Sequence, residues 1–135
     1  MAHQIPALER FLDQSFPKLG LDIDGCMDEM PQFFQFLSHV WPGQVVVVTA
    51  RADEQEASEY VAELGIRFDE LFATGSLAAK PAVVIEQQIE IFLDDQPEAL
   101  KGMPDSVRTL LVRNDGNYDF DDHRWMLSDK TGKLL

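Results

Sequence analysis

Two apolar segments of this chain of 135 residues end abruptly in aspartates. The segment that begins at Leu19 runs into Asp22 and Asp24, and the segment 90–93 runs into Asp94 and Asp95. A short apolar run that stops in this way is typical of a buried strand at the edge of a sheet. If the strands are parallel neighbours, their ends meet, and a group of carboxylates faces one point beyond the sheet.

A threonine and a lysine stand at two further element ends. Thr49 follows four consecutive valines, and Lys80 precedes Pro81 at the start of a predicted helix. Several carboxylates around one lysine form a costly cluster of like charge unless a cation neutralises it, and oxygen ligands favour Mg²⁺. We expect Asp22, Asp94 and the backbone carbonyl of Asp24 to hold this ion. Since Mg²⁺ keeps several waters and commonly bridges to phosphate, the expected substrate carries phosphate.

The spacing of apolar residues predicts strands that alternate with helices. This alternation is typical of a three-layer, Rossmann-like α/β fold with a mainly parallel five-stranded sheet flanked by helices. Residues 1–135 are expected to form a single domain. Strands are expected at 19–25, 44–49, 71–73, 90–93 and 107–112, and helices at 7–16, 31–41, 53–64, 80–88 and 97–100.

One predicted helix, 31–41, has an unusually broad apolar face. It includes Phe33, Phe36 and Val40, and we expect this face to be buried in the core. After the last predicted strand, the stretch 114–122 is rich in acidic and turn-forming residues and is expected to be a loop.

The composition limits the classes of partner. The formal net charge is −13, so nucleic acid is an unlikely ligand. The single cysteine, Cys26, cannot form an intramolecular disulfide, and residues 1–4 do not resemble the start of a signal peptide, which favours a cytoplasmic location. No apolar run approaches the length of a membrane span, so no membrane association is expected.

Four segments of the chain, in this order, resemble the four motifs of the haloacid dehalogenase (HAD) superfamily. The resemblance implies an HAD-like domain in which Asp22 is the nucleophile that attacks phosphorus and forms an aspartyl-phosphate. Asp24 would then be the acid and base, and a second carboxylate at this position is characteristic of the phosphatase branch. The segments are 21–25, 47–51, 80–81 and 91–95.

The resemblance also implies roles for the remaining polar groups. Thr49 would bind phosphoryl oxygens, Lys80 would balance the charge of nucleophile and phosphate, and Asp94 with Asp95 would hold Mg²⁺ together with Asp22 and Asp24. Arg51, near the end of its strand, is a candidate for contacting a second anionic group of the substrate.

The short spans between these motifs leave no room for a substantial cap domain, so we expect an open site. Such a site suits a phosphoprotein or a small phosphate ester such as a nucleotide, and a second copy of the chain is a candidate for closing it. Two alternatives stay open. A catalytically inactive HAD-like scaffold is favoured by Cys26, which stands where the family often has threonine. A receiver-type signalling domain has a similar set of residues, but in a different order.

Overall fold

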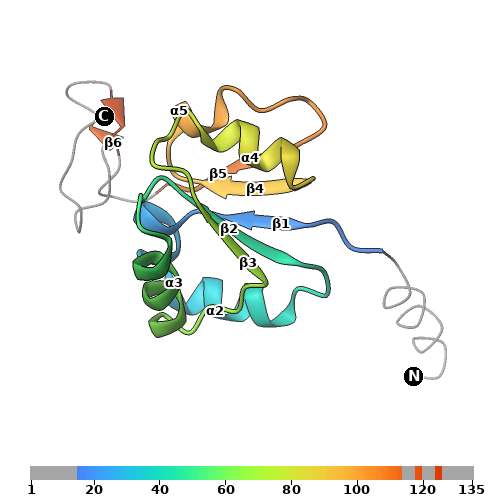
Figure 1. The fold of residues 1–135 in the computed structure, drawn as a ribbon, viewed down its shortest axis with the longest axis vertical. Coiled ribbons are helices and arrows are strands. Elements are labelled where there is room, and N and C mark those ends of the chain that lie inside the picture. Colours follow the sequence, from blue (N-terminus) through green and yellow to red (C-terminus); the bar gives the residue numbers. More distant parts are fainter. Residues whose placement is uncertain (1–14, 114–117, 120–123, 126–135) are drawn as a thin grey trace.

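The computed structural model describes residues 15–113, 118–119 and 124–125. Within them, the chain forms a five-stranded sheet whose strands are all parallel, in the order β3-β2-β1-β4-β5 (Figure 1). Helices cover both faces, and these residues contain no cap domain, so the predicted fold class is confirmed. The strands are β1 (Leu19–Leu21), β2 (Val45–Thr49), β3 (Glu70–Ala73), β4 (Ile91–Asp94) and β5 (Arg108–Leu111).

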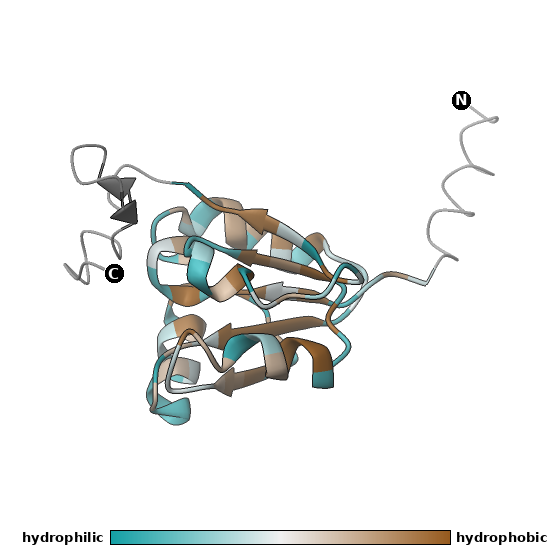
Figure 2. Ribbon diagram, turned by 90° about the horizontal axis from the view of Figure 1, so that it is seen from above, coloured by the Kyte–Doolittle hydropathy of each residue, from teal (hydrophilic) through white to brown (hydrophobic). Residues whose placement is uncertain are grey.

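Two pairs of helices form the outer layers. On one face of the sheet lie α2 (Pro31–Val40) and α3 (Glu54–Glu63), and on the other lie α4 (Lys80–Glu86) and α5 (Pro97–Leu100) (Figure 1). The strands between them are largely hydrophobic (Figure 2). Both ends of α3 lie at residues that favour a helix end. At the start, Asp53 accepts a hydrogen bond from the backbone amide of Glu56 at 3.0 Å. At the other end, Gly65, with φ +74°, follows the last turn.

The valine block of β2 explains how one strand joins two cores. Val45 and Val47 pack in the cluster that contains Phe34 of α2, whereas Val46 and Val48 pack in the cluster that contains Val84 of α4. Successive side chains of a strand point to opposite faces, so a central strand covered on both sides is apolar at every position.

The strand order reverses beside β1. From β1 the chain moves outward through β2 to β3, and then returns to pair β4 with the other side of β1. Ligands of open parallel sheets bind beyond the carboxyl ends of the strands at such a reversal. Asp22 follows β1 directly, and Asp94 ends β4 with Asp95 next to it, so the two acidic segments lie at this position.

The prediction that the whole apolar face of α2 is buried was wrong. Phe34 is buried, but Phe33, Phe36 and Val40 have exposed fractions of 53%, 70% and 53%. The reason is geometric: α2 is in an outer layer and turns only the side that carries Phe34 and Ser38 toward the core. No described segment covers its outer side.

Parts of the prediction fall outside the described residues. The helix expected at 7–16 lies there except for its last two positions, and so does most of the acidic stretch 114–122. Inside that stretch, β6 (Tyr118–Asp119) pairs antiparallel with β7 (Arg124–Trp125), which lies beyond it, a pairing that the sequence did not predict. Among the described helices, none has the length and apolar character needed to span a membrane.

Candidate functional site

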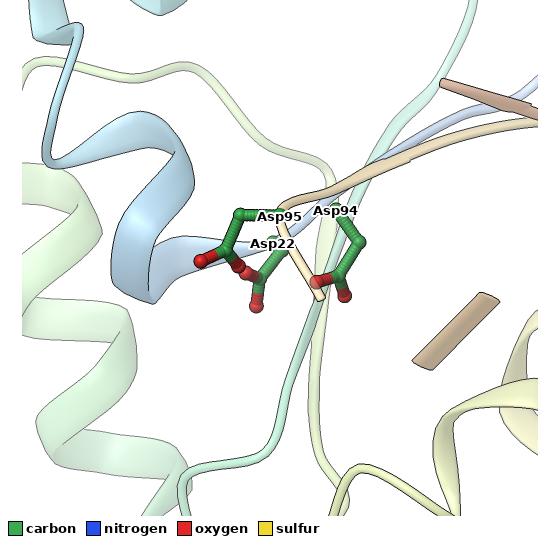
Figure 3. Close-up of side chains that lie close together, drawn as sticks. All are labelled: Asp22, Asp94 and Asp95. Carbon is green, nitrogen blue, oxygen red and sulfur yellow. The ribbon is translucent and has the colours of Figure 1, made fainter. Parts of the chain in front are cut away.

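Three buried aspartates meet beyond the ends of β1 and β4. One carboxylate oxygen from each of Asp22, Asp94 and Asp95 lies within 4.8 Å of the others (Figure 3). The strand register explains the meeting, because Leu21 pairs with Leu93 and the amide of Asp22 donates a hydrogen bond to the carbonyl of Leu93 at 3.1 Å. Asp22, just after β1, and Asp94, the last residue of β4, are therefore neighbours although they are far apart in the chain.

Lys80 supplies the positive charge of this group. Its ammonium donates hydrogen bonds to Oδ1 of Asp22 at 2.6 Å and to Oδ2 of Asp94 at 2.7 Å, and the lysine side chain is only 1% exposed. Lys80 is the first residue of α4, as the sequence indicated. Lys101, the other lysine near this part of the sequence, is exposed in the turn after α5.

The buried charges of the site do not balance. Burial, and next the neighbouring Asp94, raise the pKa of Asp22 well above its usual value. Burial disfavours the charged form of Lys80, but Asp22 and Asp94 outweigh this effect and raise the pKa of Lys80. Three carboxylates against one ammonium leave a deficit of positive charge that a cation would remove.

The donor set fits a hard divalent cation. Its side-chain donors are carboxylate oxygens, which are the ligands that Mg²⁺ prefers. Both oxygens of Asp94 accept hydrogen bonds, one from Lys80 and one from the amide of Gln96 at 2.9 Å. Asp22 and Asp95 are therefore better placed than Asp94 to coordinate the ion directly.

The carboxylate of Asp95 packs closely against the turn that follows β1. This turn, η1 (Ile23–Met27), contains Gly25 with φ +80°, a conformation that favours glycine. A Cβ atom at Gly25 would overlap the carboxylate of Asp95. The amide of Gly25 donates a hydrogen bond to Oδ1 of the buried Asp28 at 2.9 Å, which fixes the turn.

Asp24 faces Arg51 and not the three aspartates. Its carboxylate accepts two hydrogen bonds from the Arg51 guanidinium, from Nε at 2.9 Å and from Nη2 at 2.8 Å. The hydrogen bond to Asp24 raises the pKa of Arg51, and the guanidinium lies 4.4 Å from the centre of the Tyr60 ring. In this arrangement only the backbone carbonyl of Asp24 remains as a candidate metal ligand from that residue. Arg51, expected to contact substrate, instead pairs with the candidate acid and base.

Thr49 ends β2 beside this ion pair. Its hydroxyl oxygen accepts a hydrogen bond from the amide of Arg51 at 3.2 Å, and its carbonyl accepts hydrogen bonds from the amide and the hydroxyl of Thr74 at 2.8 and 3.0 Å. Thr49 is fully buried, so its hydroxyl has a fixed position at the end of the strand.

Cys26 has a packing role. It is fully buried, and its thiol donates a weak hydrogen bond to the carbonyl of Leu93 at 4.0 Å. Burial, and next the carboxylate of Asp22, raise the pKa of Cys26 well above its usual value. A protonated buried thiol is a poor nucleophile, so Cys26 is not a candidate catalytic residue.

Sequence reasoning missed three residues that shape the site. Asp28 anchors the η1 turn, and the Tyr60 ring lies against Arg51. The buried Gln96 donates two hydrogen bonds, from its backbone amide to Asp94 and from its side-chain Nε2 to Asp95 at 3.3 Å. Asp28 and Gln96 carried a local signal, because each is a polar residue next to a predicted motif. Tyr60 carried none, since only the fold brings α3 to the end of β2.

Comparisons of this chain with protein-family models, with curated proteins and with solved structures found no match.

Proposed function

We propose that this chain is a Mg²⁺-dependent phosphohydrolase of the HAD type, which cleaves a phosphate monoester through an aspartyl-phosphate on Asp22. One observation carries the proposal: the Lys80 ammonium bridges Asp22 and Asp94, with Asp95 in the same group, where the strand order reverses. Paired carboxylates with one buried lysine and a missing positive charge suit the transfer of an anionic phosphoryl group.

Asp22 is the proposed nucleophile. Lys80 holds Oδ1 of Asp22, which orients the carboxylate so that its other oxygen can attack phosphorus in line with the leaving oxygen. Mg²⁺, held by Asp22, Asp95 and the backbone carbonyl of Asp24 with Asp94 behind them, would offset the negative charge of phosphoryl group and carboxylates. Thr49, with its buried hydroxyl at the end of β2, is placed to bind a phosphoryl oxygen.

Asp24 is the proposed acid and base. It would protonate the leaving oxygen and then take a proton from the water that hydrolyses the aspartyl-phosphate. Both of its oxygens accept hydrogen bonds from Arg51, so proton transfer requires at least one of these bonds to yield to the substrate. Arg51 then has donors available for an oxygen of the substrate.

The proposed substrates are phosphoproteins and small phosphate esters. Among the described residues no cap covers the site, so a large substrate can reach it, and a second copy of the chain could close it over a small one. A net charge of −13 disfavours nucleic acid. The proposed location is the cytoplasm, which agrees with a single cysteine that is buried as a thiol.

The strand order argues against the receiver alternative. Doubly wound receiver domains have the order 2-1-3-4-5, whereas this sheet has the order 3-2-1-4-5. The inactive scaffold remains the rival, because it needs the same fold and the same metal ligands.

Hydrolysis of 4-nitrophenyl phosphate separates the two. We expect turnover that needs MgCl₂, stops on chelation and falls at least about 10³-fold in Asp22→Asn. Asp105→Asn, which changes an exposed aspartate of the loop before β5, is the matched control and should keep full activity. A folded protein that binds Mg²⁺ but hydrolyses neither this ester nor any member of a phosphometabolite panel would instead be the scaffold.

A further inference from the structure

Arg51 is held by side chains from two separate elements. Its guanidinium donates hydrogen bonds to both oxygens of Asp24 in the η1 turn, from Nε at 2.9 Å and from Nη2 at 2.8 Å. The same guanidinium lies over the Tyr60 ring of α3, 4.4 Å from the ring centre. A planar guanidinium can make both contacts at once, because its hydrogen bonds lie in its plane and the ring packs against its face.

The second side chain of α3 that reaches Arg51 holds it less firmly. Glu56 lies one turn before Tyr60, on the same side of the helix. Its carboxylate approaches Nη1 of Arg51 only to 3.8 Å, and its side chain is 71% exposed. An ion pair of this length in solvent contributes little. Of these two contacts from α3, the Tyr60 ring is therefore the one that fixes the guanidinium.

The proposed chemistry of Asp24 needs a partner that keeps its place. Asp24 would transfer a proton twice, and each transfer uses an oxygen that Arg51 holds in the structure. The side chains of Asp24 and Arg51 are 19% and 26% exposed, so water competes for both groups. A guanidinium that turned toward solvent would leave the carboxylate without a fixed direction. A ring packed against the guanidinium opposes this movement.

We propose that Tyr60 is a positioning residue, which keeps Arg51 in place so that Arg51 directs the Asp24 carboxylate during proton transfer. This inference rests on the proposed function and gives α3 a part in the site. The role needs the aromatic ring of Tyr60 and not its hydroxyl group. Because Arg51 acts here on the acid and base, the loss of Tyr60 should lower kcat more than it raises KM.

Kinetics with glycerol 2-phosphate, whose leaving oxygen needs a proton, test the proposal. We expect Tyr60→Leu to lower kcat about ten-fold and to change KM less than about two-fold, whereas Tyr60→Phe should keep the kcat of the unaltered protein. Arg51→Met should lower kcat at least as much, and adding Tyr60→Leu to it should cause no further loss. Leu64→Ala, one turn further along and packed against the same core, is the matched control and should keep both constants.

The Nε–H proton of Arg51 gives a second measurement, which needs no turnover. This proton is hydrogen-bonded to Asp24, so we expect slow exchange with water in nuclear magnetic resonance spectra, where its signal is identified by its absence in Arg51→Met. Exchange should become at least about five-fold faster in Tyr60→Leu but not in Tyr60→Phe. That pattern in a protein that hydrolyses no ester would contradict the phosphohydrolase proposal and still support the positioning of Arg51 by Tyr60.

Two results would overturn the proposal. One is an exchange rate of the Arg51 Nε–H proton in Tyr60→Leu that equals the rate in the unaltered protein. The other is a loss of kcat from Tyr60→Leu that is equally large in the Arg51→Met background, because Tyr60 would then act through the packing of α3 and not through Arg51.

Discussion

The ammonium of Lys80 donates a hydrogen bond to Oδ1 of Asp22 at 2.6 Å, across 58 positions of the chain. The same ammonium reaches Asp94, so one lysine from the start of α4 links the carboxyl ends of β1 and β4. Both partners are almost completely buried, and neither charge would be stable at this place without the other. The contact therefore matters for stability as well as for the proposed chemistry.

Lys80→Met should destabilise the metal-free protein by about 3–5 kcal/mol, because it leaves Asp22 and Asp94 buried without their cation. Denaturant unfolding in the presence of a chelator measures this change. Lys101→Met, at the exposed lysine after α5, should change the free energy of unfolding by less than about 0.5 kcal/mol. Equal effects of the two substitutions would mean that the buried ion pair is not formed in solution.

Asp24→Asn should lower kcat by about 10²–10⁴-fold and leave Mg²⁺ affinity nearly unchanged, since Asp24 points its carboxylate at Arg51 and not at the three aspartates. Steady-state kinetics and calorimetric titration with MgCl₂ measure the two quantities. The loss should be larger for an alkyl phosphate than for 4-nitrophenyl phosphate, whose leaving group needs little protonation. A loss of Mg²⁺ affinity with unchanged kcat would contradict the acid and base role.

Gly25→Ala should weaken Mg²⁺ binding, because the added Cβ overlaps the carboxylate of Asp95 and displaces it. Gly75→Ala is a well-matched control: Gly75 also has a positive φ, of +78°, but a Cβ there would meet no atom within 4 Å. Both variants pay the backbone strain, of order 1 kcal/mol, so both should unfold more easily. Only Gly25→Ala should also lose metal affinity, and similar affinities in the two variants would show that Asp95 is not a ligand.

The stability of the metal-free protein should depend on pH through Asp22. Its pKa is raised in the folded state above the usual value of 3.8, so the folded chain holds this proton to higher pH than the unfolded chain does. The contribution of Asp22 to stability is therefore present below about pH 4 and is lost as the pH rises toward the folded-state pKa. Asp22→Asn removes this loss.

Urea unfolding of both proteins at several pH values, with chelator, checks the sign. The stability of Asp22→Asn relative to the unaltered protein should increase above pH 4, at most by about 1.4 kcal/mol per pH unit. A difference that stays constant from pH 4 to pH 8 would mean that Asp22 ionises normally in the folded chain.

The sequence predicted the parts of the fold that depend on local signals. The end of β4 could be placed because an apolar run stops at Asp94, and α3 because Asp53 and Gly65 mark its ends. The first strand, predicted at 19–25, was extended too far, since β1 ends at Leu21 and the η1 turn follows. Lys80 could be placed at the start of α4 because it precedes Pro81. In each case the informative residue is close in the chain to the feature that it marks.

The sequence did not predict features that depend on the packing of separate elements. The apolar residues of α2 suggested burial, but how much of a helix is covered depends on which layers surround it, and Phe33 and Phe36 face outward among the described residues. The pairing of Asp24 with Arg51 was missed as well. It requires the side-chain directions at the η1 turn and at the end of β2, which motif spacing does not contain.

Calorimetric titration with MgCl₂ alone tests most directly whether the three buried aspartates form a metal site. The account predicts one Mg²⁺ bound per chain, with affinity lowered at least about ten-fold in Asp95→Asn and unchanged in Asp105→Asn. Two results would contradict this account. One is the absence of binding up to tens of millimolar MgCl₂, which is a weak limit for a Mg²⁺ site. The other is equal Mg²⁺ affinity in the unaltered protein, Asp95→Asn and Asp105→Asn.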